Sequence, residues 1–245
     1  MNFLIADDNE INRQFLHAVL SGPQHQISEA ANGREAIALC RERHFDLIFM
    51  DIRMPEMDGI EATRKIKKLA DHNPARTCII ALTADLQLKL QDRLLADGFA
   101  ACLTKPISRQ RLLDIVERVQ KGLCLEIETQ LDGADDDAPI DLEKALAATG
   151  GNRELLEKLS SMFTAELLQM LPEIMTALKA GDFDPIHQCA HKLRASAGYC
   201  GAKSVQHAAA ELETAAIAMD SDRVGRAAEN LQVESARLIA HLKDN

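Results

Sequence analysis

The chain contains no tryptophan and a single tyrosine, and aromatic residues make up only 3% of its 245 residues. Proteins that bind single-stranded nucleic acid stack its bases on aromatic side chains, which are scarce here. Basic residues are also in the minority, since 28 lysines and arginines face 38 aspartates and glutamates, for a formal net charge of -10. Nucleic-acid backbones are bound by clustered basic residues. We therefore expect no nucleic-acid partner.

Long apolar runs are absent as well. No stretch approaches the roughly 20 residues that a membrane-spanning helix needs, and no charged and then apolar leader opens the chain. These absences predict a cytoplasmic protein with no membrane partner. The six cysteines lie far apart, without the close pairs that zinc sites use, so we expect neither a structural disulfide nor a zinc site. The apolar fraction of 47% is ample for packed cores, and the length allows one large domain or two ordinary ones.

The first half of the chain alternates short β-like runs with segments of helical spacing. The expected strands are Asn2–Ala6, Gln26–Glu29, Phe45–Met50, Cys78–Leu82 and Ala100–Leu103. The expected helices are Ile11–Leu20, Arg34–Arg43, Gly59–Ala70, Leu86–Ala96 and Arg109–Val119. Five such units, each a strand followed by a helix, predict an α/β doubly wound fold with a five-stranded parallel sheet. The fully apolar centre of the run from Phe45 favours a central strand that is buried on both faces.

The pattern changes after Lys121. Residues 126–137 hold six carboxylates and no basic side chain, which predicts an acidic linker over residues 122–138. Beyond it, apolar residues recur at helical spacing along four successive segments, which predicts an all-α four-helix bundle over residues 139–245. We therefore expect two domains, with the α/β domain occupying residues 1–121.

Polar side chains follow four of the strand-like runs in the first domain. Asp7 and Asp8 come after the first run, Asp51 after the third, Thr83 after the fourth and Lys105 after the fifth. The carboxyl ends of parallel strands meet at one edge of the sheet, where open α/β folds place their sites. We therefore expect these five side chains to converge.

This set of residues suits phosphoryl chemistry at an aspartate. Three carboxylates form the hard, oxygen-rich ligand set that Mg²⁺ prefers, together with water and a substrate phosphate. Asp51 would attack phosphorus as a carboxylate nucleophile, and Thr83 and Lys105 would hold the phosphate oxygens. The alternative is that Asp7 and Asp8 merely cap the helix that follows them.

Four motifs surround these residues. They are Ala6-Asp7-Asp8-Asn9, Met50-Asp51-Ile52-Arg53-Met54-Pro55-Glu56-Met57-Asp58-Gly59, Ala81-Leu82-Thr83-Ala84 and Thr104-Lys105-Pro106. On these motifs, residues 1 to about 120 resemble the receiver domain of response regulators. The resemblance implies that Asp51 is the phosphoacceptor. It also implies a Mg²⁺ site formed by Asp8, Asp51 and the backbone carbonyl of Arg53, with Asp7 assisting through water. One position departs from the family pattern, because Cys102 stands where receivers that signal by changing shape usually carry Tyr or Phe.

A histidine in the second domain is a second candidate site. The apolar stripe of its helix consists of Ile186, Ala190, Leu193 and Ala197. At 100° per residue, His191 lies about 130° from that stripe, so its ring is expected to reach solvent. Arg194 places a cation beside the ring, and the small residues Ala195 and Gly198 leave a clearing there. The alternatives are an ordinary surface histidine, or His187 one turn earlier as the acceptor.

An exposed imidazole is largely neutral at cytosolic pH and can accept a phosphoryl group that a nearby arginine would stabilise. The stretch Ala190-His191-Lys192-Leu193-Arg194-Ala195-Ser196-Ala197-Gly198 is followed by Gly201-Ala202 and Leu212-Glu213. On these residues, the segment from Ile140 onward resembles a histidine phosphotransfer (HPt) domain, which implies that His191 is the phosphohistidine. Arg194 stands where lysine is common in that family, and Ala195 where glycine is common.

The two resemblances together predict an intermediate of a two-component phosphorelay. Phosphate would reach Asp51 from an upstream sensor histidine kinase, expected to be hybrid, exchange with His191 and pass to a downstream response regulator receiver. The chain has no Gly-rich nucleotide loop or kinase domain, so we expect a phosphotransfer protein rather than a turnover enzyme. A flexible linker of about 17 residues reaches about 20–25 Å, enough for both sites to meet in one molecule. Two alternatives stay open, a phosphorylation-controlled binding module and a phosphate sink that drains a downstream regulator.

Overall fold

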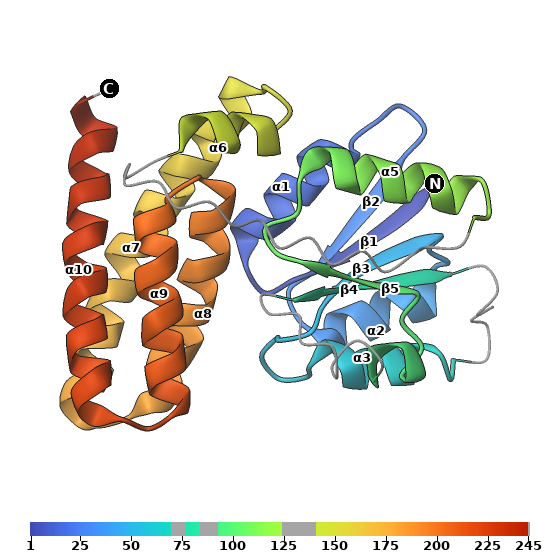
Figure 1. Ribbon diagram of the computed structural model, residues 1–245. Coiled ribbons are helices and arrows are strands. Elements are labelled where there is room, and N and C mark those ends of the chain that lie inside the picture. The colour runs from blue at the N-terminus through green and yellow to red at the C-terminus, as the bar shows by residue number, and fades with distance from the viewer. Residues whose placement is uncertain (70–76, 84–92, 124–140, 245) are drawn as a thin grey trace. The chain divides into compact units, whose positions relative to one another are not determined.

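The computed structural model describes residues 1–69, 77–83, 93–123 and 141–244. The chain divides into two compact units, Met1–Asp132 and Gly133–Asn245, each with its own hydrophobic core (Figure 1). Within the described ranges, no helix has both the length and the apolar character that crossing a membrane requires.

The N-terminal unit is built on a five-stranded sheet in the order β2-β1-β3-β4-β5, and every neighbouring pair is parallel. The strands are β1 (Asn2–Ala6), β2 (Gln26–Ala30), β3 (Leu47–Asp51), β4 (Cys78–Thr83) and β5 (Ala101–Thr104). All five residues of β3 are buried, as expected for a central strand that is covered on both faces. The prediction of a doubly wound parallel sheet with this run at its centre is confirmed.

Helices cover both faces of the sheet. They are α1 (Glu10–Leu20), α2 (Gly33–Glu42), α3 (Gly59–Ile66) and α5 (Arg109–Gln120). Figure 1 shows α1 and α5 over one face and α2 and α3 over the other. Of the helix predicted over Leu86–Ala96, residues 93–96 are helical and the remainder lies outside the described residues. The predicted acidic linker also lies outside them, apart from residues 122 and 123.

The start of α1 decides between the two explanations of the acidic pair. The helix is capped by Asn9, whose side-chain oxygen accepts hydrogen bonds from the backbone N–H groups of Ile11 at 2.8 Å and Asn12 at 3.3 Å. Asparagine is among the residues that satisfy the unpaired N–H groups of a first helical turn best. The explanation of Asp7 and Asp8 as mere caps of this helix is therefore wrong.

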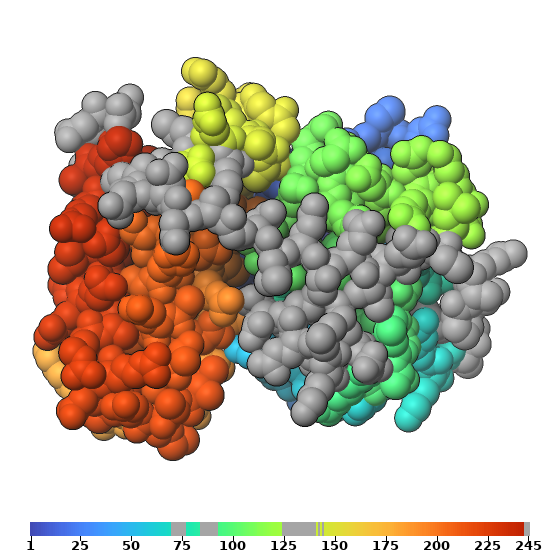
Figure 2. Space-filling model, viewed as in Figure 1, coloured from blue at the N-terminus to red at the C-terminus, as the bar shows by residue number. Residues whose placement is uncertain are grey.

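The C-terminal unit is helical. Its helices are α6 (Leu142–Ala148), α7 (Arg153–Ala180), α8 (Phe183–Tyr199), α9 (Lys203–Ile217) and α10 (Ser221–Asp244). The last four form a closed ring in which α7 packs against α8, α8 against α9, α9 against α10, and α10 against α7. Figure 2 shows the side chains of α9 and α10 in direct contact along the bundle. The predicted four-helix bundle is confirmed, with α6 as a short additional helix.

Apolar side chains from all four long helices fill the centre of this bundle. Fully buried members include Leu159, Phe163, Leu167, Ile186, Leu193, Val205, Leu212, Val224 and Leu231. Tyr199, the only tyrosine of the chain, is also fully buried, at the end of α8. Because the chain has no tryptophan, tyrosine fluorescence reports on the packing of the C-terminal unit alone.

Candidate functional site

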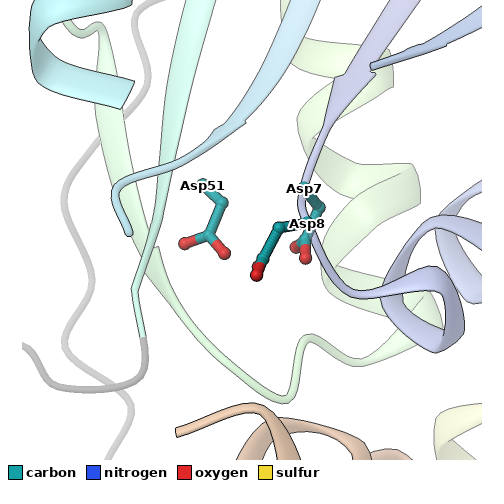
Figure 3. Close-up of side chains that lie close together, drawn as sticks. All are labelled: Asp7, Asp8 and Asp51. Atoms are coloured by element: carbon teal, nitrogen blue, oxygen red, sulfur yellow. The ribbon is translucent and has the colours of Figure 1, made fainter. Parts of the chain in front are cut away.

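Three carboxylates gather at the carboxyl edge of the sheet. Asp51 is the last residue of β3, while Asp7 and Asp8 directly follow the neighbouring strand β1. Figure 3 shows the three side chains directed into the same space. One carboxylate oxygen from each lies within 4.8 Å of the others. Asp7 and Asp51 are buried, and Asp8 is partly exposed.

Lys105 reaches these carboxylates from the end of the edge strand β5. It follows β5, and its ammonium nitrogen lies 2.6 Å from Asp51 Oδ2 and 2.7 Å from Asp7 Oδ2. Thr83 ends β4 and is buried, and its backbone carbonyl accepts a hydrogen bond from the N–H of Lys105 at 2.7 Å. The side chains of Asp7, Asp8, Asp51 and Lys105 therefore converge at one edge of the sheet as predicted, and Thr83 ends its strand at the same edge.

The charged groups of this cluster shift one another's pKa values. Burial raises the pKa of Asp51 to about 7; the positive charge of Lys105 opposes this shift, and the negative charges of Asp7 and Asp8 reinforce it. Burial by itself would lower the pKa of Lys105, but the charges of Asp51 and Asp7 outweigh it and raise that pKa. The lysine therefore stays an ammonium, and its one positive charge faces the three carboxylates of Asp7, Asp8 and Asp51. Such an excess of buried negative charge favours binding of a further cation.

The donor set also fits a divalent metal ion. All three acidic side chains offer hard oxygen ligands, which suit Mg²⁺ better than the nitrogen and sulfur ligands that zinc prefers. Arg53, the fourth predicted ligand, lies just beyond β3, and its backbone N–H donates to Asp51 Oδ1 at 3.2 Å. This hydrogen bond holds the start of the loop that follows β3 against the carboxylate of Asp51.

A glycine fixes the other end of that loop. A Cβ atom on Gly59 would lie 2.0 Å from the backbone oxygen of Asp51, so only glycine fits this position. The N–H of Gly59 donates to the carbonyl of Ile52 at 3.0 Å, and Asp58 caps α3 by accepting from the N–H of Glu61 at 2.7 Å. The motif Asp58-Gly59 therefore closes the loop around Asp51, which explains why these two residue types occur together.

The second candidate site differs from its prediction in one respect. His191 is buried, with 8% of its surface exposed, so the expectation that its ring reaches solvent freely is wrong. The four residues of the predicted stripe are buried as expected. The prediction assumed that α8 buries one apolar stripe. Because α8 packs against both α7 and α9, side chains beyond that stripe are buried as well. A side chain from α9 lies against the imidazole.

That side chain is Glu213, which the sequence reasoning did not single out as a site residue. Its Oε1 lies 2.8 Å from Nδ1 of His191, and its Oε2 accepts a hydrogen bond from Arg194 at 3.0 Å. Glu213 is only 3% exposed. It lies on the face of α9 that also carries the buried residues Val205 and Ala209, at steps of four residues. A carboxylate on such a face requires a buried partner, and this was the signal that could have identified it.

Glu213 fixes the tautomer of His191. Burial alone would raise the pKa of Glu213, but the hydrogen bonds and positive charge of His191 and Arg194 lower it to about 2. An ionised carboxylate can only accept, so Nδ1–H of His191 donates a hydrogen bond to Glu213, and in the neutral imidazole the lone pair is then on Nε2. His187 lies at the edge of this cluster, with Nε2 3.9 Å from Glu213 Oε1 and its ring centre 6.4 Å from that of His191.

The lowered pKa of Glu213 predicts an acid-sensitive bundle. Since the folded-state pKa of about 2 lies below the ordinary value of 4.5, the carboxylate stabilises the fold above pH 4.5 and loses that contribution as the pH falls towards 2. Between pH 7 and pH 3 we expect the free energy of unfolding to fall by about 1 kcal/mol more in the wild type than in Glu213→Gln, allowing for solvent screening. Urea unfolding followed by Tyr199 fluorescence measures this difference.

The matched control is Glu211→Gln, which removes an exposed carboxylate from the same helix. It should keep the pH dependence of the wild type. Equal pH dependence in the wild type and Glu213→Gln would show that Glu213 carries no stabilising charge.

Two family models match this chain. Residues 3–117 match the model of the response regulator receiver domain, and residues 158–244 match that of the Hpt domain. The sensor protein EvgS of Escherichia coli (strain K12) is 29% identical over 90% of this chain and 18% of its own length. The signal transduction histidine-protein kinase BarA of Shigella flexneri is 30% identical over 82% of this chain and 22% of its own length.

The chain therefore spans about a fifth of the length of these curated relatives. Among solved structures, the chemotaxis response regulator CheY4 of Vibrio cholerae is 30% identical to this chain. The match covers 48% of this chain and 97% of CheY4, with a TM-score of 0.45.

Proposed function

Residues 3–117 are a response regulator receiver domain and residues 158–244 are an Hpt domain, and from this premise we propose that the chain is an intermediate in a phosphorelay. Asp51 accepts a phosphoryl group, and His191 exchanges that group with Asp51 and with the receiver of a downstream response regulator. The observation that carries the proposal is that one chain holds both an aspartate with a paired lysine and a histidine oriented by a buried glutamate.

At the first site, a carboxylate oxygen of Asp51 attacks phosphorus while the bond between phosphorus and the imidazole of the donor breaks. Lys105, at 2.6 Å from Asp51, stabilises the negative charge of the incoming phosphoryl group, and the Thr83 hydroxyl at the end of β4 holds another of its oxygens. Asp8, Asp51 and the backbone carbonyl of Arg53 would hold Mg²⁺. When bound, the ion neutralises charge on the phosphoryl oxygens. Asp7 would assist through water.

At the second site, Nε2 of His191 is the nucleophile. The carboxylate of Glu213 accepts a hydrogen bond from Nδ1–H, which keeps the lone pair on Nε2, and its negative charge offsets the positive charge that the ring gains as the new P–N bond forms. The bond between phosphorus and Asp51 breaks in the same step, and Asp51 leaves as a carboxylate. Arg194, which is 28% exposed and bound to Glu213, is placed to pair with the phosphoryl oxygens.

The relatives suggest the source of the phosphate. Both are named as sensor proteins or histidine-protein kinases, and they carry the matching region within much longer chains. We propose a hybrid sensor histidine kinase as the upstream donor, acting in the cytoplasm, and a separate receiver domain as the downstream acceptor. Kinase activity itself is no part of the described domains.

The test is to load the wild-type chain with a small phosphodonor that carries a ³²P label, in the presence of Mg²⁺. Label should appear first as an acyl phosphate, which base hydrolyses, and then as phosphohistidine, which acid hydrolyses. Transfer within one molecule would proceed at a rate that does not depend on protein concentration.

The same experiment separates the alternatives. Label that stays on Asp51 until hydrolysis, and reaches neither His191 nor an added receiver, would support the phosphorylation-controlled binding module. If label flows from an added phosphorylated receiver into this chain faster than it flows outward, the chain is a phosphate sink.

A further inference from the structure

Asn12 lies in the first turn of α1 and contacts the acidic site, although the relay described above assigns it no role. Its side-chain Nδ2 donates to Asp7 Oδ1 at 3.0 Å and to Asp7 Oδ2 at 3.2 Å. The residue is 1% exposed. Because Asn9 already caps α1, Asn12 is not needed to begin that helix. Its amide is therefore directed at Asp7 for another reason.

Asp7 is held by donors on both of its oxygens. Besides Asn12, the backbone N–H of Asn9 donates to Oδ1 at 3.0 Å, and the ammonium group of Lys105 lies 2.7 Å from Oδ2. The carboxylate is completely buried. Its orientation is consequently fixed by Asn9 and Asn12, which come from the same short segment of chain.

Lys105 depends on that orientation. Its ammonium nitrogen lies between Asp7 Oδ2 at 2.7 Å and Asp51 Oδ2 at 2.6 Å. When Asp51 takes a phosphoryl group, the lysine must remain close while its partner changes. Asp7 is the contact that persists, and so Asp7 determines where the positive charge lies as the phosphoryl charge develops.

The other end of the Asn12 amide supports a functional role. Among the residues that the structure describes, Asn12 Oδ1 is buried without a hydrogen-bond partner. A buried acceptor without a partner lowers the stability of the fold. An apolar side chain would fill the same space without that cost. The donor half of this amide is used and the acceptor half is not, which indicates that its contact with Asp7 is the useful one.

We infer that Asn12 is a positioning residue for phosphorylation: it fixes the carboxylate of Asp7, and through Asp7 it holds the Lys105 ammonium against Asp51. This inference rests on the proposed phosphorylation of Asp51. We therefore expect Asn12 to affect the rate of the chemical step and to have little effect on the affinity for the phosphodonor.

The first measurement uses the chain without metal or phosphate. In the wild type, the buried Lys105 ammonium should give a slowly exchanging proton signal by NMR. In Asn12→Ala we expect these protons to exchange about tenfold faster, because the carboxylate that holds them is released. Asn32→Ala is the matched control: it removes a buried asparagine that caps α2, and it should leave the Lys105 signal unchanged.

The second measurement is the rate of labelling from a small phosphodonor at saturating Mg²⁺. Asn12→Ala should lower the maximal rate about tenfold, with the KM for the donor within about twofold of wild type. In a Lys105→Ala background, Asn12→Ala should change the rate by less than about twofold, because its effect passes through the lysine. Asn32→Ala should label at the wild-type rate despite its lower stability.

Wild-type lysine exchange and wild-type labelling in Asn12→Ala would overturn the inference. So would a tenfold loss that persists without Lys105, since Asn12 would then act by another route. A wild-type chain that takes no label at Asp51 would instead overturn the proposed function, so the two failures are distinguishable.

Discussion

Replacing Asp51 with asparagine is expected to abolish uptake of phosphate by this chain, from small donors and from a phosphorylated kinase alike. The amide keeps the shape of the side chain but has no nucleophilic carboxylate oxygen, so labelling should fall by at least about 10³-fold. His191 should also remain unlabelled, because in this direction its phosphate arrives through Asp51. Incorporation of ³²P into the full chain, resolved by acid and base stability, measures both losses.

His191→Gln is the matched control for this experiment. It should take label at Asp51 at the wild-type rate and accumulate the acyl phosphate, because the onward acceptor is missing. Label on the Asp51→Asn chain that resists base and is lost in acid would contradict the expected order of transfer. It would show that His191 accepts phosphate from the donor directly.

Unfolding does not explain the expected loss. Burial, opposed by Lys105 and reinforced by Asp7 and Asp8, raises the pKa of Asp51 to about 7, so a charge at this position is unfavourable for the fold. Asparagine removes that charge while Asp7 keeps its contact with Lys105. We therefore expect the thermal midpoint of Asp51→Asn to equal or exceed that of the wild type, by calorimetry.

Replacing Glu213 with glutamine is expected to slow phosphorylation of His191 by about 10- to 100-fold, while Asp51 is labelled normally. An amide can present either its oxygen or its nitrogen to Nδ1, so it no longer dictates which ring nitrogen carries the proton. It also lacks the negative charge that offsets the charge gained by the ring during transfer. The rate at which label moves from Asp51 to His191 in a single turnover measures the effect.

Glu211→Gln again serves as the control, because it changes an exposed carboxylate on the same helix. Its transfer rate should match that of the wild type. Tyr199 fluorescence verifies that each variant keeps a folded bundle, since that residue is buried at the end of α8. Normal transfer in a folded Glu213→Gln chain would mean that the contact with His191 is structural.

The sequence predicted the receiver fold and the place of its site for a simple reason. A parallel sheet aligns the ends of its strands at one edge, so residues that follow separate strands meet whatever the details of packing. Asp51, Thr83 and Lys105 could be placed together from their positions in the strand pattern alone. The four long helices of the bundle follow likewise from apolar spacing along each segment.

The details of each site required contacts between elements. Glu213 and His191 lie 22 residues apart on different helices, and they meet only because of the rotation and register with which α8 and α9 pack. The exposure of His191 was misjudged for the same reason, since the pattern of one helix does not show what its neighbours cover. Cys102, which departs from the receiver pattern, is buried in β5.

The sequence by itself determined which residues are candidates for the chemistry, because an apolar run followed by a carboxylate, or a histidine on a patterned helix, encodes its place in the fold locally. Only the tertiary structure decided how those residues are held. The span of Lys105 between Asp7 and Asp51, the amide of Asn12 on Asp7 and the carboxylate of Glu213 on His191 each depend on distances of about 3 Å. Such distances are set by the packing of whole elements, which no single segment of sequence specifies.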